Sequence, residues 1–485
     1  MNFLNSMRSD TYFFGTAQLL ERVLSFFMLP VLINSVSMVE YAIWTQSIVT
    51  VGLMLPLTLL GFQTAIVKFM PYWGNSPKLA NSILKAMCLA ILTWAIIISL
   101  FIQVFASDLS VFIFGDVKYF YFIPALILLI LSESFFEFLI NLLRIRRQVR
   151  LASIYIFMKG VWRLSIIIIS ISIFESGFFF GFLVFAILQS IVVVFMILYH
   201  LEIGKLKMSS LFFGKENWSE VIKFSLPLVV IAALTFFNNF TDRYFITHFI
   251  GLEILASYAA VYSLAGIGSI FYSTLGFTLF PELSRQWDIS SKLKKGELLG
   301  EALVFYLFFQ MPFIFGLAIV GPNLMAILSG SLIIVPLSIY ILLGLNIALF
   351  GIYQIVWYVV LLGSGSLSGF KILLIASIVN IVFNFLMIPV LGILGAAISG
   401  SLSNSILVLL CLYIARQSVV IRIPWKTLQD VFVRSLCLGL FLFFCDVYLD
   451  LSKLIVLGLV IIFSTLVYGL FDLLGATRSI LKGYV

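Results

Sequence analysis

The sequence predicts an all-α integral membrane protein with fourteen transmembrane helices, arranged as two six-helix lobes followed by two C-terminal helices. Of the 485 residues, 62% are hydrophobic and only 10% are charged, whereas soluble proteins are about half apolar and about a quarter charged. Apolar runs of roughly 20 residues recur along the chain, and each is long enough to cross a hydrocarbon core of ~30 Å as a helix. The distribution of basic residues then sets the expected orientation.

The first apolar run begins after Arg8 and contains Gln18, Glu21 and Arg22. It is longer and more polar than the apolar segment of a signal peptide, so it is interpreted as an uncleaved first span. The expected spans, in chain order, are residues 11–34, 38–62, 83–106, 119–142, 152–174, 179–201, 222–248, 255–280, 301–320, 332–358, 370–390, 393–415, 430–447 and 454–474.

Basic residues concentrate on one side of this arrangement. If the N-terminus is cytoplasmic, the cytoplasmic segments hold 23 of the 29 Lys and Arg residues, and the outer loops hold only Lys118 and Lys453. Cytoplasmic loops of membrane proteins carry an excess of Lys and Arg. The sequence therefore predicts that both termini are cytoplasmic. The formal net charge of +8 is explained by these loops, so no nucleic-acid partner is expected.

Weak internal matches indicate that the two lobes are a duplication. An acid–arginine pair occurs in the first span (Glu21-Arg22) and again in the seventh (Asp242-Arg243). Three further matches occur in the same order: "YAIW" (41–44) and "YAAV" (258–261); Lys159/Arg163 and Asn380/Asn384, each spaced i, i+4; and "SGFFFG" (176–181) and "LGILGAA" (391–397). Because six spans separate the copies, both lobes enter the membrane from the same side, as in a parallel repeat.

This repeat gives the expected domain organisation. Residues 1–201 form the N-terminal lobe with spans 1–6, and residues 202–221 form a cytoplasmic linker. Residues 222–416 form the C-terminal lobe with spans 7–12, and residues 417–485 carry spans 13 and 14 and a cytoplasmic tail.

The loops argue against an enzyme. They contain no G-x4-G-K-[ST] phosphate-binding loop, no HExxH and no GxSxG sequence, which are the patterns of nucleotide hydrolysis, zinc proteolysis and serine hydrolysis. The two histidines, His200 and His248, do not have the spacing of metal ligands, so no metal site is expected. Movement of a molecule across the membrane is the better-supported class of function.

Charges within the spans are the candidate functional residues, since each costs roughly 2.5–3.5 kcal/mol at mid-bilayer and should face the bundle interior or water. The acidic members are Glu21, Glu133, Glu137 and Asp242, and the basic members are Arg22, Lys159, Arg163 and Arg243. Two interpretations remain open for spans 4 and 5, because Glu133 and Glu137 could form a structural ladder with Lys159 and Arg163.

Arg22 lies in the middle of its span, which favours a water-filled cavity. Arg243 lies in the outer half of its span, where it either contacts cargo or snorkels to the interface beside Asp242. Basic groups on several spans suit an anionic cargo, because a guanidinium binds phosphate in a bidentate manner. Asn238 and Asn239, close to Arg243, are candidates for binding sugar hydroxyls.

Three stretches carry a family resemblance. "ERVLSFFMLPVLINSVSMVEYAIW" (21–44), "NNFTDRYFITHFIGLEILASYAAVYSLA" (238–265) and "NIVFNFLMIPVLGILGAAISGSLSN" (380–404) resemble bacterial polysaccharide repeat-unit flippases. These are the Wzx-type branch of the MATE-like MOP exporter superfamily, which acts in O-antigen and capsule biosynthesis. "FPELSRQ" (280–286) resembles the end of their eighth span.

The resemblance implies a multi-pass protein of the bacterial inner membrane with a central cationic cavity. It implies a cargo of undecaprenyl-pyrophosphate-linked oligosaccharide, and as partners membrane lipids, a polysaccharide polymerase and a chain-length regulator. Arg22 and Arg243 match positions where the family commonly has arginine, which implies a pyrophosphate-binding role. No cofactor is expected, although the four carboxylates leave coupling to H+ or Na+ open. A cation-coupled drug exporter and a membrane glycan polymerase or ligase are the alternatives.

Overall fold

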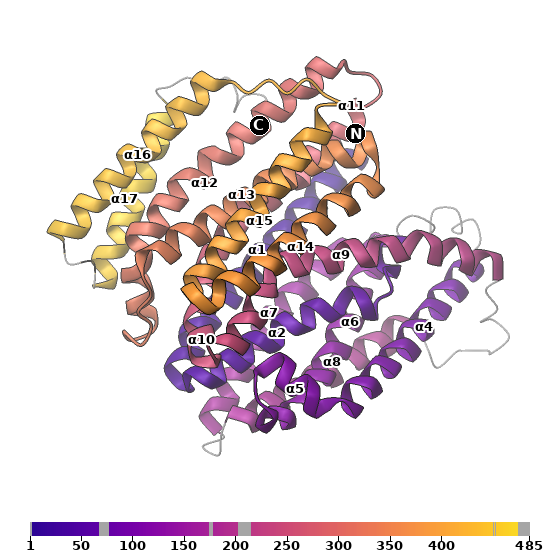
Figure 1. Ribbon diagram of the computed structural model, residues 1–485. Coiled ribbons are helices and arrows are strands. Elements are labelled where there is room, and N and C mark those ends of the chain that lie inside the picture. The colour runs from indigo at the N-terminus through magenta and orange to yellow at the C-terminus, as the bar shows by residue number, and fades with distance from the viewer. Residues whose placement is uncertain are drawn as a thin grey trace. The chain divides into compact units, whose positions relative to one another are not determined.

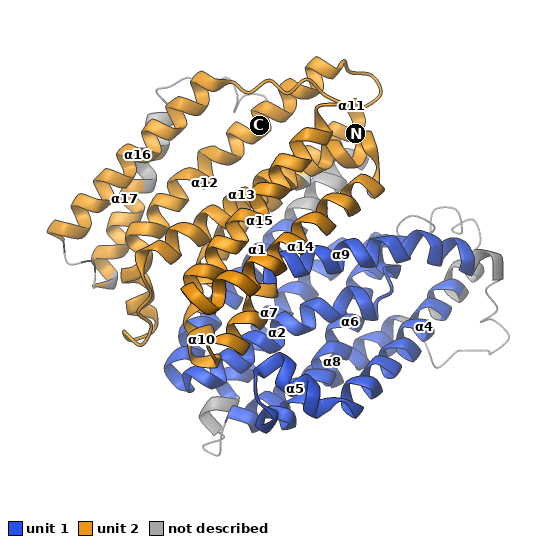
Figure 2. Ribbon diagram, viewed as in Figure 1, with its two compact units in different colours: residues 1–240 blue, residues 241–485 orange. Residues whose placement is uncertain are grey.

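The computed structural model describes residues 2–66, 77–173, 178–201, 215–449, 451 and 453–473. Within these ranges the chain forms helices joined by turns and short extended segments, with no β-strand. The chain divides into two compact units, residues 1–240 and residues 241–485 (Figure 2). Helices satisfy their backbone hydrogen bonds internally, which is why an apolar chain in a bilayer adopts them.

Unit 1 is built mainly of long helices (Figure 1). Its elements are α1 (Asn2–Ser35), α2 (Met38–Thr58), α4 (Pro77–Val104), α5 (Ala106–Phe114), the 3-10 helix η1 (Val117–Phe122), α6 (Ile123–Ile145), α7 (Val149–Ile173), α8 (Phe178–Leu201) and most of α9 (Lys215–Phe249). A capping box starts α2: the Ser37 hydroxyl accepts the Glu40 backbone N–H, and the Glu40 carboxylate accepts the Ser37 backbone N–H at 2.8 Å. Such a cap satisfies donors that the first helical turn leaves unpaired.

Unit 2 contains the end of α9 and all later elements. These are α10 (Leu252–Ala265), the 3-10 helix η4 (Gly266–Gly268), α11 (Ser269–Gln286), α12 (Lys292–Leu328), α13 (Leu337–Ser364), α14 (Ser366–Leu391), α15 (Ile393–Ala415), α16 (Trp425–Tyr448) and α17 (Leu454–Leu473).

The two units repeat one packing scheme. In unit 1 the fourth span, α6, packs against α2, α4 and α8, and α7 packs against α8. In unit 2, α13 is the fourth span of the predicted C-terminal lobe when α9 is counted as the first. It packs against α10 and α11, against α12 and against α15, while α14 packs against α15. In both predicted lobes the fourth span thus contacts the second, third and sixth.

The fold class predicted from the sequence is confirmed. Among the residues that the structure describes, thirteen helices are long and apolar enough to cross a membrane, and each coincides with one of the first thirteen expected spans. The fourteenth, expected at 454–474, corresponds to α17, whose searched part gives only the shorter apolar helix Ile455–Ser464. The number fourteen and the placement of both termini in the cytoplasm therefore stay predictions.

Several helices differ from their expected bounds, and two of these differences have a clear physical reason. The span expected at 301–320 is the centre of α12, which begins at Lys292, because hydropathy identifies only the hydrocarbon part of a helix that continues beyond it. Ser291 caps α12 by accepting the Lys294 backbone N–H. The span expected at 255–280 consists of α10 and α11, joined by the 3-10 turn Gly266–Gly268, an interruption that hydropathy does not register.

The expected four-part domain organisation stays a prediction. The boundary between the compact units falls between Phe240 and Thr241, inside α9. Most of the expected linker, residues 202–214, lies outside the described residues.

Candidate functional site

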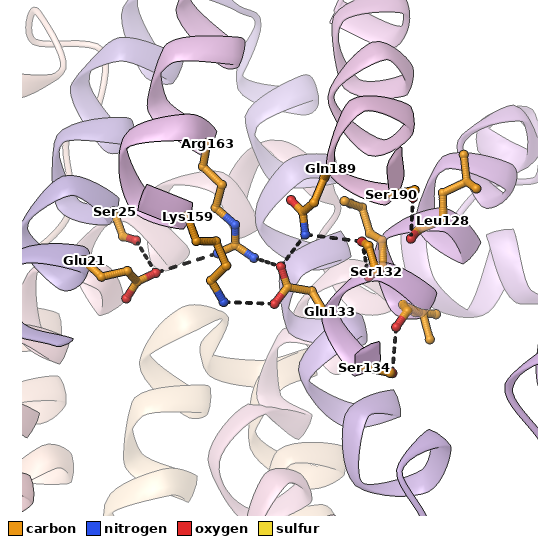
Figure 3. Close-up of polar contacts among 12 residues, drawn as sticks. Glu21, Ser25, Leu128, Ser132, Glu133, Ser134, Lys159, Arg163, Gln189 and Ser190 are labelled. Atoms are coloured by element: carbon orange, nitrogen blue, oxygen red, sulfur yellow. Dashed lines mark hydrogen bonds and ion pairs between the residues drawn. The ribbon is translucent and has the colours of Figure 1, made fainter. Parts of the chain in front are cut away.

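Glu133 is the centre of a polar cluster inside unit 1 (Figure 3). Its side chain on α6 is 6% exposed and receives donors from two neighbouring helices. From α7, Lys159 Nζ lies 3.1 Å from Glu133 Oε2, and Arg163 Nη2 pairs with Glu133 Oε1. From α8, Gln189 Nε2 donates to the same Oε1 atom and lies 3.3 Å from Ser132 Oγ. Three helices therefore converge on one carboxylate.

Helix geometry explains how α7 supplies both cations. Residues four apart on a helix lie on one face, so Lys159 and Arg163 reach the same acceptor from successive turns. Their side chains are each 14% exposed. A buried carboxylate is tolerated only with counter-ions and hydrogen bonds, and this one has both.

The cluster extends to α1 through Glu21. Arg163 Nη1 lies 3.9 Å from Glu21 Oε1, and the Ser25 hydroxyl donates to that oxygen at 3.3 Å. Gly160 permits the close approach of α1 to α7, because a Cβ there would lie 3.1 Å from Leu24 and 3.3 Å from the Glu21 Cα. The next residue, Arg22, is exposed on α1.

The predicted ladder between spans 4 and 5 exists, with one of its two expected acids. Glu133 binds both Lys159 and Arg163, whereas the carboxylate of Glu137, one turn along α6, forms no ion pair with another described residue. The Glu137 backbone carbonyl accepts a hydrogen bond from Asn141. Gln189 was not among the predicted site residues, although the stretch 182–197 is apolar apart from Gln189 and Ser190, a signal that could have identified it.

A second polar cluster lies in unit 2 around Asp242, which is 4% exposed. Its Oδ2 atom accepts the Tyr258 hydroxyl of α10, and its Oδ1 atom accepts the Arg243 backbone N–H at 2.9 Å. The Arg243 guanidinium lies over the Tyr262 ring, 4.9 Å from its centroid, a cation–π arrangement. Arg243 is 5% exposed, so it does not have the exposure of an arginine that snorkels to the interface.

The two predicted sugar-binding asparagines differ in their surroundings. Asn239 is half-buried and donates from Nδ2 to the Thr235 carbonyl at 2.9 Å, within its own helix. Asn238 is buried, with 3% exposure. The structure therefore places Glu21, Glu133, Lys159 and Arg163 in one cluster and Asp242 with Arg243 in another.

Unit 2 also has a neutral polar contact between its fourth and sixth spans. Asn404 on α15 donates from Nδ2 to the side-chain oxygen of Asn346 on α13 and to its backbone carbonyl, at 3.3 Å for the latter. On α14, Asn384 Nδ2 donates to Asn380 Oδ1 at 2.8 Å. All four asparagines are buried.

The sequence matches a known protein family over much of its length. The family described as polysaccharide biosynthesis protein matches residues 8–287, more than half of the 485 residues. The chain belongs to the polysaccharide biosynthesis protein family. This assignment agrees with the predicted relation to polysaccharide flippases.

A curated relative and two solved structures extend this result. The chain is 23% identical over 261 residues to a probable low-salt glycan biosynthesis flippase of Haloferax volcanii, covering 53% of this chain and 55% of that protein. The chain thus matches about half the length of that relative. The relative is described as a flippase and not as an enzyme, in line with the expectation that this chain is not an enzyme.

The lipid II flippase MurJ, in an inward closed conformation, matches 96% of this chain and 99% of its own, with a TM-score of 0.73 and 16% identity. An inward-facing MATE family multidrug resistance transporter of the MOP superfamily matches 86% of this chain and 96% of its own, with a TM-score of 0.58 and 12% identity. At these identities the two matches show a shared fold.

Proposed function

We propose that the protein flips undecaprenyl-pyrophosphate-linked oligosaccharide repeat units from the cytoplasmic to the periplasmic leaflet of the bacterial inner membrane. The observation that carries the proposal is the exposed Arg22, located within an apolar span and next to a glutamate that faces α7. A charge inside a span is costly unless it faces water or the bundle interior. A guanidinium binds a pyrophosphate in a bidentate manner.

The site residues predicted from the sequence have distinct roles in this proposal. Arg22 and Arg243 engage the pyrophosphate, with Lys159 and Arg163 contributing to a cationic cavity and Asn238 and Asn239 contacting sugar. Glu21, Glu133, Glu137 and Asp242 balance these charges or couple transport to H+ or Na+. The polyprenyl tail stays in lipid during alternating access, and a polymerase and a chain-length regulator receive the product.

The competing function is a cation-coupled drug exporter. The observation that supports this alternative is the fold shared with the multidrug resistance transporter. The proposal is tested in a strain that lacks its own repeat-unit flippase. Wild-type protein should restore surface polysaccharide, Arg22→Ala should not, and Arg22→Lys should restore it in part, at equal membrane levels. Full export by Arg22→Ala would refute the cationic-cavity mechanism.

The leaflet that holds the stalled intermediate separates the remaining classes. Without a flippase, lipid-linked repeat units accumulate in the cytoplasmic leaflet, whereas without a polymerase or ligase they accumulate in the periplasmic leaflet. Labelling of the sugars in intact spheroplasts with a membrane-impermeant, sugar-reactive reagent measures this directly. Outer-leaflet accumulation in the deletion strain would assign the protein to the enzyme class.

A further inference from the structure

The turn between α6 and α7 contains four arginines in seven residues: Arg144, Arg146, Arg147 and Arg150. The segment 144–150 contains no acidic residue, and we call it the arginine turn. It lies at the end of unit 1 that is expected to face the cytoplasm. The positive-inside rule explains a positive charge here, but Lys satisfies that rule equally well.

The backbone of the arginine turn is unusual for its sequence. Arg147 has φ +59°, in the left-handed region. Gln148 N–H donates to the Leu143 carbonyl at 2.8 Å, the hydrogen bond of a helix ending at which the left-handed position is usually glycine. A side chain with a Cβ is disfavoured in this conformation. Non-glycine residues held there concentrate at functional sites.

Unit 2 makes the corresponding connection without arginine. Between α13 and α14 the positive-φ residue is Gly365, at φ +76°, and its N–H donates to the Val360 carbonyl at 3.1 Å. The surrounding residues 363–366 are glycine and serine. The fold therefore allows a glycine in the connection between the fourth and fifth spans. Unit 1 has Arg147 there instead, although its Cβ disfavours the left-handed conformation.

Three side chains of the arginine turn, those of Arg144, Arg146 and Arg150, contact other helices. The Arg144 guanidinium lies over the Phe14 ring of α1 at 4.9 Å, and that of Arg150 over the Phe13 ring at 5.3 Å. Arg146 Nη1 donates to the His200 carbonyl of α8 at 3.0 Å. Arg144, Arg147 and Arg150 are exposed. Arg144 Nη1 also donates to Asn141 Oδ1 of its own helix at 3.5 Å. A guanidinium that stacks on an aromatic ring can still bind an anion through its edge, where its N–H donors lie.

We propose that the arginine turn binds the pyrophosphate of the lipid-linked cargo before transport begins. This rests on the proposed function, since that cargo starts in the cytoplasmic leaflet. A pyrophosphate has several oxygens, and each guanidinium beside the first span can bind two of them at once. This bidentate binding favours Arg over Lys at these positions. The site is separate in sequence from the intramembrane charges and supplies the first contact with cargo.

The test uses the full-length protein in nanodiscs of neutral phosphatidylcholine, titrated with undecaprenyl pyrophosphate and separately with phosphatidylglycerol. Arg147→Gly removes the guanidinium and relieves the backbone. Its melting temperature should therefore be equal or higher, while its affinity for the pyrophosphate lipid falls roughly tenfold, as expected for one charge-assisted contact. Replacing Arg144, Arg147 and Arg150 together by Gln should reduce the affinity further. Arg285→Gln, which changes an exposed arginine in the last turn of α11, is the matched control and should bind normally.

The outcomes separate this inference from the proposed function. If wild-type protein and Arg147→Gly bind the pyrophosphate lipid equally, the arginine turn is not a cargo site, and the proposed function stands. If the variants lose both lipids to the same extent, the turn binds bulk anionic phospholipid and the inference is wrong. If wild-type protein binds no pyrophosphate lipid, both the inference and the proposed cargo are wrong.

Discussion

The two units solve the same packing problem with different chemistry. In unit 1 the fourth and sixth spans meet through Glu133 and Gln189, and in unit 2 through Asn346 and Asn404. In the sequence, Gln189 and Asn404 each lie twelve residues after a glycine, Gly177 and Gly392 respectively. The interhelical polar contact is therefore common to both units, and only unit 1 has a carboxylate in it.

The fifth spans follow this difference. In unit 1, α7 carries Lys159 and Arg163, which pair with Glu133. In unit 2, α14 carries Asn380 and Asn384 at the same i, i+4 spacing, hydrogen-bonded to each other. Cations thus occur where the neighbouring fourth span has an acid. Glu133, Lys159 and Arg163 therefore form a matched set, in which each buried charge needs the opposite charge of the others as a counter-ion.

The largest effect is expected from Glu133→Gln, which keeps the shape of the side chain but leaves two cations without their buried counter-ion. Breaking a buried ion pair from one side costs about 3–5 kcal/mol. The matched change in unit 2, Asn346→Leu, leaves only neutral donors unpaired and should cost about 1–3 kcal/mol. Unfolding of both variants by titration with SDS measures the difference, and equal losses would contradict the contrast between the units.

The second effect separates stability from transport. The triple variant Glu133→Asn, Lys159→Met, Arg163→Met removes all three charges of the Glu133 cluster together. Replacing a buried ion cluster by uncharged groups is often neutral or stabilising, so the free energy of unfolding should recover to within about 1 kcal/mol of wild type. Export should still fall, by roughly tenfold or more, if the two cations contact the cargo. A stable triple variant with full export would make the cluster purely structural.

Much of this comparison was predictable, because helical spacing is local. The i, i+4 pairs and the ladder between neighbouring spans followed from sequence position alone. The contacts of Gln189 with Glu133 and of Tyr258 with Asp242 did not, because periodicity shows which residues share a helix face but not which helix that face meets. The left-handed Arg147 was also missed, since residue preference predicts glycine there.

A smaller effect is expected at Gly400, which lies against the amide contact of unit 2. A Cβ at Gly400 would lie 2.3 Å from Asn346 Nδ2, so Gly400→Ala should displace that side chain and cost about 1–3 kcal/mol, as overpacking does. The double variant with Asn346→Ala should lose less than the sum of the two single changes, because the smaller side chain removes the clash. Strict additivity in SDS unfolding would show that the two residues do not interact.

The smallest effect is expected at Ser134, next to Glu133 on α6. Its hydroxyl contacts Thr58 Oγ1 of α2 and also donates to the Ile130 carbonyl at 2.7 Å. In Ser134→Ala the Thr58 hydroxyl keeps its own backbone acceptor, Met54 O at 3.0 Å, so no buried donor is left unpaired. Interhelical hydrogen bonds in membranes average about 0.6 kcal/mol in double-mutant cycles, and a loss of that size is expected. Because Ser134 and Glu133 are adjacent, a loss equal to that of Glu133→Gln would mean that burial on α6, and not charge, determines the cost of polar substitutions in unit 1.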